Sequence, residues 1–511
     1  MNAVEELLGA AALARHGSRI ALACGAQTVS YAELADQAAR ASQALASLGV
    51  APGDRVLLLM RDTPEFAAAW LGAVRAGAVA IALNTKLTED EFRHIRADSG
   101  ARLAIVEDVF ASARPDLAAE HAEKGDLAVA GAQAPAGARD WRAELARAAP
   151  AAPFDARPET PAFWLYSSGT TGKPKGIIHS HASVLASGEA LRLLGIGAGE
   201  RVFTTSKCFF AYGLEHGLLG PLALGATGVI LADWADADAA IEAVRRDPPV
   251  AMFSVPTFYR RLLAEPAQRL EPFRGIRHFV AAGERLPQQV LGQWRQATGR
   301  GILSLYGNSE AYCACMMMPP GADAGDERTG VPLPLTDAML RDGGGNEPAG
   351  GEPGVLWIRH PALAKGYANR PEQTAAQFRD GWFCTQDVFV RDAAGIYTHK
   401  GRADELLKIA GQWVQPSDLE DAAMGDAAIK EAACVAVADA DGFERLALFV
   451  AACGDAGAAA SAAALACERA LPRYKRPKWV RALPELPRTA TGKVQRYKLR
   501  EILERELALK L

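Results

Sequence analysis

The sequence is poor in the features that mark several large classes of protein. Eight cysteines are spread thinly over 511 residues, and aromatic side chains make up only 7% of the chain. The one close cysteine pair, Cys313 and Cys315, has no second pair or histidine cluster nearby, which argues against a disulfide framework and a zinc site. The longest weakly polar run, residues 217–232, is too short to span a bilayer and contains four glycines. We therefore expect no membrane-spanning segment, and a buried strand–turn–strand in this run.

The chain also lacks an excess of charge of either sign. Lys and Arg number 56 against 60 Asp and Glu, a net charge of −4, so nothing indicates a nucleic-acid-binding surface. The N-terminus carries two glutamates before its apolar stretch and no basic segment, which argues against a secretory signal. With 50% hydrophobic residues, the composition is typical of a large globular cytoplasmic protein with reduced core thiols and, from its length, about three to four domains or subdomains.

Helical and strand-like patterns alternate along the chain. Residues 28–50 have apolar residues at three and four spacing and end at a glycine, residues 54–60 form an apolar run, and residues 64–84 read as a helix followed by a strand. Further strand-like runs follow from residue 163 to residue 307. This alternation predicts an α/β fold with parallel sheets covered by helices.

The texture changes twice more. Residues 131–161 are rich in Ala and Pro and are predicted to be an exposed connector. From about residue 333, Gly and Pro turns separate short strands, which indicates a β-rich subdomain. We predict a large N-terminal domain over residues 1–402 and a small, mobile α+β C-terminal domain over residues 403–511, with an Ala-rich helix near residues 455–471.

The segment Tyr166–Gly176 reads YSSGTTGKPKG and follows a predicted strand. Glycines let backbone N–H groups approach an anion, hydroxyls donate hydrogen bonds, and lysines neutralise charge, so this composition suits a polyphosphate. It is not a Walker A loop, because Pro174 stands where that pattern requires a second glycine.

This segment strongly resembles the phosphate loop of the adenylate-forming superfamily, which includes acyl- and aryl-CoA ligases, peptide-synthetase adenylation domains and luciferases. Further motifs of that superfamily follow in order: FFAYG at 209–213, AAGERLP at 281–287, YGNSE at 306–310, WFCTQD at 382–387, GRADELLKIAGQW at 401–413 and PRTATGK at 487–493. The resemblance covers nearly the whole chain.

The resemblance implies an enzyme that joins a carboxylic acid to the α-phosphorus of ATP, releases pyrophosphate, and passes the acyl group to the thiol of coenzyme A. It places a set of residues around ATP and AMP: Ser167, Ser168, Gly169, Thr170, Thr171, Gly172, Lys175, Gly283, Glu284, Tyr306, Gly307, Asn308, Ser309, Asp387 and Arg402. Beside that set, Glu310 is implied to help hold Mg²⁺, which prefers oxygen ligands. The resemblance also implies that Tyr306 packs on adenine and that Asp387, supported by Arg402, accepts hydrogen bonds from the ribose.

The C-terminal motifs imply a moving lid. Lys493 is implied to be catalytic together with Glu310 and Thr170, its ammonium stabilising the developing charge on the carboxylate and phosphate oxygens. Asp404 matches the hinge, and a swing about it brings the CoA-channel residues Lys408, Gly411 and Trp413 into place. The basic run 473–478 either meets CoA phosphates or is a solvated face.

The acyl-substrate pocket is implied to be lined by Phe210, Ala211, Tyr212, Gly213, Ala281, Ala282, Gly307 and Cys313. FFAYG resembles benzoate- and aminobenzoate-CoA ligases more than fatty-acid ligases, and aromatic walls suit a ring. FFAYG also lacks the aspartate that holds an amino acid's ammonium. His179, His181 and His216 are either pocket or structural histidines, and we expect structural roles.

Three positions depart from the family pattern. Cys313 stands where benzoate-type ligases often carry His, Gln386 where the motif has Gly, and Ser309 where Thr is commoner. The first affects the acyl pocket, and the second affects the ribose loop.

We expect an ATP-dependent aryl-acid CoA ligase that uses Mg²⁺ and acts on a small aromatic acid, without a nucleic-acid or membrane partner. A carrier-protein phosphopantetheine as acceptor, a medium-chain acyl-CoA ligase, a binding protein that has lost catalysis, and a homodimer as the assembly all stay open.

Overall fold

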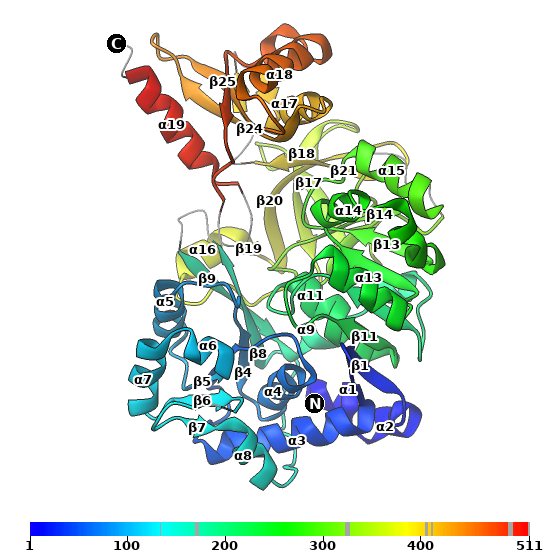
Figure 1. Cartoon of the computed structure of the whole chain (residues 1–511), viewed down its shortest axis with the longest axis vertical. Helices are drawn as coiled ribbons and strands as arrows, with labels where there is room; N and C mark the ends of the chain where they lie inside the picture. Colours follow the sequence, from blue (N-terminus) through cyan, green and yellow to red (C-terminus); the bar gives the residue numbers. More distant parts are fainter. Residues whose placement is uncertain are drawn as a thin grey trace. The chain divides into compact units, whose positions relative to one another are not determined.

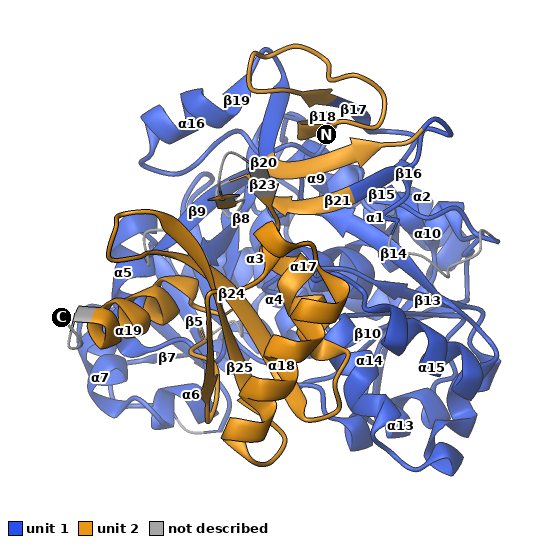
Figure 2. Ribbon diagram, turned by 90° about the horizontal axis from the view of Figure 1, so that it is seen from above, with its two compact units in different colours: residues 1–339, 357–385, 393–398 blue, residues 340–356, 386–392, 399–511 orange. Residues whose placement is uncertain are grey.

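The computed structural model describes residues 1–132, 134–168, 173–321, 328–403, 407–409, 412–488 and 494–508. It divides into two compact units (Figure 2). Unit 1 comprises residues 1–339, 357–385 and 393–398, and unit 2 comprises residues 340–356, 386–392 and 399–511. The predicted α/β class, with a β-rich region and a small C-terminal part, is confirmed.

Unit 1 contains a seven-stranded sheet in the order β7-β6-β5-β3-β4-β8-β9, parallel except for the last pair. Its strands are β3 (Arg55–Leu59), β4 (Val79–Ala82), β5 (Leu103–Glu107), β6 (Leu127–Ala130), β7 (Arg139–Asp140), β8 (Pro161–Ser168) and β9 (Pro174–Ser180).

Helices cover both faces of this sheet because successive side chains of a strand point to opposite sides. Val56 and Leu58 pack in one apolar cluster with α3 and α4, whereas Leu57 and Leu59 pack in another with α5 and α7 (Figure 1). The helices around this sheet are α1 (Ala3–Leu8), α2 (Ala10–His16), α3 (Tyr31–Ser47), α4 (Pro64–Arg75), α5 (Glu89–Ser99), α6 (Asp108–Ser112), α7 (Pro115–Glu123) and α8 (Trp141–Arg147). The predicted elements at 28–50, 54–60 and 64–84 are confirmed.

The second sheet of unit 1 has nine strands in the order β16-β15-β14-β13-β12-β10-β11-β1-β2. Its strands are β1 (Ile20–Cys24), β2 (Gln27–Ser30), β10 (Arg201–Thr204), β11 (Thr227–Ile230), β12 (Ala251–Ser254), β13 (His278–Ala281), β14 (Ile302–Gly307), β15 (Ala314–Met317) and β16 (Val331–Pro332). In sheet order, the six strands β14-β13-β12-β10-β11-β1 pair in parallel. The strands at the two edges, β2 on one side and β15 and β16 on the other, pair antiparallel.

This sheet is also buried on both faces. Phe203 and Phe279 pack with α13, α14 and α15, whereas Val202, Phe253 and Val280 pack with α10. The helices here are α9 (His181–Leu185), α10 (Glu189–Leu193), α11 (Ala211–Leu214), the π-helical turn η1 (Glu215–Leu219), α12 (Gly220–Leu224), α13 (Ala237–Arg246), α14 (Pro256–Leu263), the 3₁₀ segment η2 (Ala267–Gly275) and α15 (Gln288–Thr298).

A five-stranded sheet follows the order β17-β18-β20-β19, with β21 paired to β20, and its residues are divided between the two units. It consists of β17 (Asp337–Arg341), β18 (Pro353–Arg359), β19 (Phe378–Arg379), β20 (Trp382–Arg391) and β21 (Tyr397–Arg402), with α16 (Pro371–Gln377) before β19. This region is the β-rich subdomain that the Gly and Pro turns after about residue 333 predicted.

The C-terminal part of unit 2 is built on the sheet β24-β25-β26, with α17 and α18 on one face and α19 on the other. Its elements are β22 (Leu407–Ile409), β23 (Gln412–Val414), α17 (Pro416–Met424), β24 (Ile429–Ala438), β25 (Glu444–Ala452), α18 (Ala456–Ala470), the 3₁₀ turn η3 (Arg473–Lys475), β26 (Trp479–Leu483) and α19 (Arg496–Ala508). The Ala-rich helix predicted near residues 455–471 is therefore present.

Two local predictions were wrong. Residues 131–161 are not a wholly exposed connector, because α8 places Trp141, which is fully buried, against α3. Residues 217–232 are not a strand–turn–strand: they begin in η1, continue through α12, turn at Gly225 and end in β11. Their apolar composition fits a buried helix as well as a buried strand.

No helix of the described part of the chain is long and apolar enough to cross a membrane. None of the eight cysteines, all of which lie in the described residues, forms a disulfide, and Cys453 alone among them is exposed.

Candidate active site

Each of the two large sheets has a switch point. There, the connections from two adjacent parallel strands lead toward opposite edges of the sheet. In open α/β sheets, ligands bind beyond the carboxyl ends of the strands at such a switch point. In the seven-stranded sheet this point lies between β3 and β5, and in the nine-stranded sheet it lies between β10 and β12. The residues after these strands therefore decide where a site can form.

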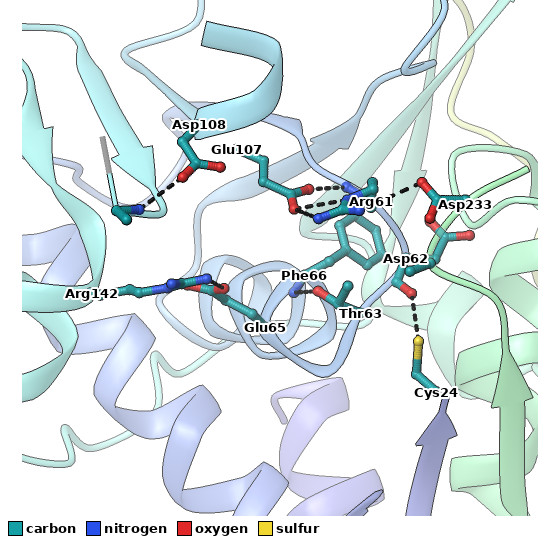
Figure 3. Close-up of polar contacts among 12 residues, drawn as sticks. Cys24, Arg61, Asp62, Thr63, Glu65, Phe66, Glu107, Asp108, Arg142 and Asp233 are labelled. Carbon is teal, nitrogen blue, oxygen red and sulfur yellow. Dashed lines mark hydrogen bonds and ion pairs between the residues drawn. The ribbon is translucent and has the colours of Figure 1, made fainter. Parts of the chain in front are cut away.

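The switch point of the seven-stranded sheet is filled by paired charges. Arg61, just after β3, donates from its backbone N–H and its guanidinium to Glu107 at the end of β5, both at 2.9 Å, and lies 3.6 Å from Asp233 (Figure 3). Below it, Asp62 pairs with Lys207 at 3.0 Å, and the Lys207 ammonium also donates to the carbonyls of Leu231 and Ala232. These groups neutralise one another, which suits a structural role.

The switch point of the nine-stranded sheet is instead surrounded by the motif residues. The FFAYG segment follows β10, Ala281 ends β13, and Tyr306 and Gly307 end β14. The register pairs Ser254 with Ala281 and Ala281 with Ser304, so these strand ends lie side by side. Parallel pairing thus brings three motifs that are far apart in the sequence to one edge.

The backbone geometry of two motif glycines explains why the segments need them. A Cβ at Gly213 would lie 2.2 Å from the carbonyl oxygen of Lys207, so no other residue fits there. Gly283 has a φ of +84°, a left-handed conformation that glycine adopts without strain.

Tyr212 is held by the ends of two strands. Its hydroxyl lies 3.3 Å from the carbonyls of Ser254 and Val280, to which it donates, and burial raises its pKa well above the usual range. Tyr212 is half-buried, Ala281, Ala282 and Cys313 are buried, and Phe210 and Ala211 are half-buried.

The YGNSE loop is tied down on several sides. Asn308 accepts the backbone N–H of Ala311 at 2.7 Å and lies 3.4 Å from the Tyr306 hydroxyl, to which its amide donates. The carbonyl of Ser309 accepts a hydrogen bond from His179 Nε2 at 2.8 Å. His179 is fully buried, burial lowers its pKa to about 4, and its ring stacks on Phe163.

Glu310 and Lys175 form the charged centre of this region. Lys175 Nζ lies 3.4 Å from Glu310 Oε1 and 3.8 Å from the centroid of the Tyr367 ring. The Tyr367 hydroxyl donates to Glu310 Oε1 at 2.8 Å. Ser167 pairs with Lys175 in the β8–β9 ladder, which places the start of the phosphate loop beside this lysine. The motifs did not identify Tyr367, because nothing local to it marks it as a partner of Glu310.

The last two residues of the ribose motif, Gln386 and Asp387, belong to unit 2. Asp387 is largely buried and lies 3.4 Å from His399 Nε2 and 3.7 Å from an Arg402 guanidinium nitrogen. Arg402 thus lies beside Asp387, as the resemblance implied. Gln386 has a φ of 62°, the left-handed region, which gives a physical reason for glycine at this position in the family.

Several predicted site residues lie outside the described residues: Gly169, Thr170, Thr171, Gly172, Asp404, Gly411 and Lys493. The side chains of Ser168, Lys408 and Trp413 are likewise not described. Glu284 and Gly307 are exposed, and His181 accepts the backbone N–H of Ala3. Within the described parts, no group of three or more His, Cys, Asp or Glu side chains has the arrangement of a metal site.

The fold and these motifs are those of an enzyme that binds a nucleotide, and the chain belongs to the AMP-binding enzyme family. The family model for the AMP-binding enzyme matches residues 10–368, and that for the AMP-binding enzyme C-terminal domain matches residues 418–493.

Similar proteins of known activity are aryl-CoA ligases. The chain is 41% identical to 3-hydroxybenzoate–CoA ligase of Aromatoleum sp. (strain CIB), over 99% of this chain and 97% of that protein. It is 39% identical to 3-hydroxybenzoate–CoA/4-hydroxybenzoate–CoA ligase of Thauera aromatica, over 99% and 98%. A crystal structure of a benzoate CoA ligase from Burkholderia xenovorans LB400 superposes with a TM-score of 0.87 at 32% identity, covering 98% of this chain and all of that one.

Proposed function

We propose that this enzyme activates a hydroxybenzoate with ATP and transfers the acyl group to coenzyme A. The observation that carries the proposal is the meeting of the FFAYG, AAGERLP and YGNSE motifs at one switch point, in a chain whose relatives along its whole length are aryl-CoA ligases. The half-buried aromatic rings of Phe210 and Tyr212 suit a flat acid better than an aliphatic chain.

The reaction has two steps. A carboxylate oxygen attacks the α-phosphorus of ATP, the bond to the bridging oxygen breaks, and pyrophosphate leaves with the electron pair. The CoA thiol, after losing its proton, then attacks the acyl carbon of the adenylate, and AMP leaves. Lys175 supplies positive charge for the phosphates in the first step, and Lys493 is assigned to the developing charge on the attacking carboxylate.

Glu310 is assigned to Mg²⁺. Mg²⁺ in nucleotide sites takes one or two carboxylates together with phosphate oxygens and waters, so one carboxylate beside the phosphate loop fits this ion. When bound, Mg²⁺ supplies neutralisation of phosphate charge. Before nucleotide binding, Lys175 and Tyr367 satisfy Glu310 Oε1.

The remaining assignments follow the same pattern. Tyr306 packs on adenine, Asp387 with Arg402 binds the ribose, and Ala281, Ala282 and Cys313 line the acyl pocket. We propose that the domain over residues 403–511 moves about Asp404 to alternate between Lys493 and the CoA channel. Eight cysteines without a disulfide suit a reducing compartment, and we assign the enzyme to the cytoplasm.

A panel of acids tests the proposal. Pyrophosphate release is measured with benzoate, hydroxybenzoates, aminobenzoates and medium-chain fatty acids, with and without CoA. We expect the highest kcat/KM with a hydroxybenzoate and an acyl-CoA product by mass spectrometry. A preference for fatty acids contradicts the aryl assignment, and transfer to a phosphopantetheinylated carrier protein but not to CoA contradicts the acceptor.

A further inference from the structure

Two buried titratable side chains follow the acyl segment directly and have no part in the reaction as described. Glu215 and His216 begin the π-helical turn η1, one turn after Tyr212, and each side chain is only 1% exposed. π-helical turns are rare and occur frequently at functional sites. The His216 ring stacks on Phe253 at 4.2 Å between centroids, and Phe253 lies in β12, one residue before the switch point.

The hydrogen bonds of the pair fix what each group offers. His216 Nδ1 lies 3.0 Å from the carbonyl of Tyr212 and must donate to it, so Nε2 of the neutral ring carries a lone pair. Burial lowers the pKa of His216 to about 4 and raises that of Glu215 to about 8, so at neutral pH both groups are uncharged. Glu215 Oε2 accepts the backbone N–H of Ala314 at 3.0 Å.

One polar atom on each side chain has no hydrogen-bond partner among the described residues. Glu215 Oε1 and His216 Nε2 are buried and make no hydrogen bond of normal geometry. The Gly188 backbone N–H and the Cys313 thiol lie beside the Glu215 carboxyl and lower its pKa slightly against the larger effect of burial. The nearest approach between the two groups, Nε2 to Oε2, is 3.8 Å, which is too long for a hydrogen bond. Buried polar atoms left unpaired cost free energy, so the native state gains when a third group satisfies both.

A phenolic hydroxyl has the chemistry that the pair requires. It donates its proton to a lone pair such as that of His216 Nε2, and it accepts a proton such as that of the neutral Glu215 carboxyl. An unsubstituted ring offers neither function, and an aromatic amine is a donor but a poor acceptor. The Cys313 thiol, whose pKa is raised by burial and by the neighbouring Glu215, borders the pair.

We propose that Glu215 and His216 recognise the ring hydroxyl of the aromatic acid and thereby make the enzyme select hydroxybenzoate over benzoate. The proposal rests on the aryl-acid activation proposed above and goes further by naming the residues that read the ring substituent. A pair with the same chemistry serves as its control: Glu189 and His360, 3.6 Å apart, each also have an unsatisfied atom. Glu189 lies on α10, outside the FFAYG segment, and accepts from the backbone N–H of Leu335. Its charge acts on Glu215, so this control carries the electrostatic effect of a neighbouring carboxylate but not the proposed contact with the ring hydroxyl.

The test measures kcat/KM for 2-, 3- and 4-hydroxybenzoate, for the matching aminobenzoates and for benzoate. The variants are Glu215→Met, His216→Phe, Glu215→Gln and the control Glu189→Met. We expect the wild type to prefer one hydroxybenzoate over benzoate, and Glu215→Met and His216→Phe to lower this ratio by about tenfold to a hundredfold through KM. Glu215→Gln retains most of the preference, because its amide can accept from Ala314 and donate to the hydroxyl.

The possible outcomes separate the two proposals. A wild type that activates none of these aromatic acids refutes the aryl assignment itself. A wild type that activates benzoates with a ratio unchanged in Glu215→Met and His216→Phe refutes the recognition pair alone, and so does an equal loss of ratio in Glu189→Met. If Glu215→Met does not fold, His216→Phe still tests the recognition pair, because its phenyl ring can stack on Phe253 as the imidazole does.

Discussion

At the scale of single residues, Tyr367 organises the charged centre of the site. It donates to Glu310 at 2.8 Å while its ring lies 3.8 Å from the Lys175 ammonium, so one side chain contacts both charges. A hydrogen bond to a carboxylate contributes more than one between neutral groups. Tyr367 is therefore expected to hold Glu310 in one orientation, which the proposed function assigns to the nucleotide site.

Tyr367→Phe removes this donor and keeps the ring over Lys175. We expect kcat/KM for ATP to fall by about tenfold, corresponding to ~1.4 kcal/mol, because Glu310 loses the bond that orients it. Pyrophosphate release at varied ATP concentration measures the change. Tyr259→Phe is the control, because its buried hydroxyl donates only to backbone carbonyls; an equal loss there contradicts the role of Tyr367.

Gln386 has a strained, left-handed backbone conformation at a position where the family has glycine. A left-handed conformation costs a residue with a Cβ about 1–2 kcal/mol, whereas glycine adopts it freely but loses more chain entropy on folding. The φ of 62° thus makes the two residues nearly balanced at this position.

Gln386→Gly is expected to raise the free energy of unfolding by at most about 1 kcal/mol, and Gln386→Val to lower it by about 1–2 kcal/mol. Urea denaturation of the full-length protein, followed by a spectroscopic probe in unit 2, measures both changes in the free energy of unfolding. A Gly variant less stable than the Val variant would show that this backbone is not left-handed in solution.

At the scale of elements, the π-helical turn η1 buries the carboxyl group of Glu215, and burial disfavours its ionised form. Burial raises the pKa of Glu215 to about 8, so the folded protein keeps the proton that the unfolded chain loses near pH 4.5. The group therefore destabilises the fold progressively as pH rises from about 4.5 to 8, and its effect is constant above that. The buried His216 has the opposite sign, since its lowered pKa makes stability rise between about pH 4 and 6.5.

Glu215→Gln removes the first of these effects and leaves the second. We expect the Tm of the wild type to fall relative to that of Glu215→Gln between pH 5.5 and 8, by at least about 2–4 °C, which corresponds to ~1 kcal/mol in a large domain. Thermal unfolding of both proteins across this range measures the difference. A difference that is independent of pH contradicts a neutral Glu215.

At the scale of the whole molecule, the two sheets of unit 1 use their switch points differently. Charges that neutralise one another fill the first, at Arg61 and Glu107 (Figure 3), whereas the second is surrounded by the motif residues. The range of the chain that contains Lys493, which we assign to catalysis, belongs to unit 2, and unit 2 has its own apolar core on both faces of the β24-β25-β26 sheet. A lysine on a separate body suits an enzyme that needs it in only one of two steps.

Lys493→Ala is expected to lower the rate of adenylation by about a hundredfold or more, because it removes charge stabilisation in that step. Thiolysis of a supplied acyl-adenylate by CoA is expected to change less than tenfold. Pyrophosphate release and acyl-CoA formation are measured separately, with Lys498→Ala, an exposed lysine of α19, as control. Equal adenylation rates in Lys493→Ala and wild type refute the assignment.

The sequence alone determined the parts of this protein that depend on local pattern. Apolar runs such as Leu57–Leu59 predicted the strands, helix periodicity predicted α3 and α4, and the ordered motifs indicated the family and the segments of the site. These succeed because side-chain period and turn chemistry act within a few residues. Only the tertiary structure decided that Tyr367 meets Glu310, 57 positions away, that Trp141 is buried and that Glu215 is held neutral. Long-range packing and desolvation set these properties, and no short stretch of sequence contains them.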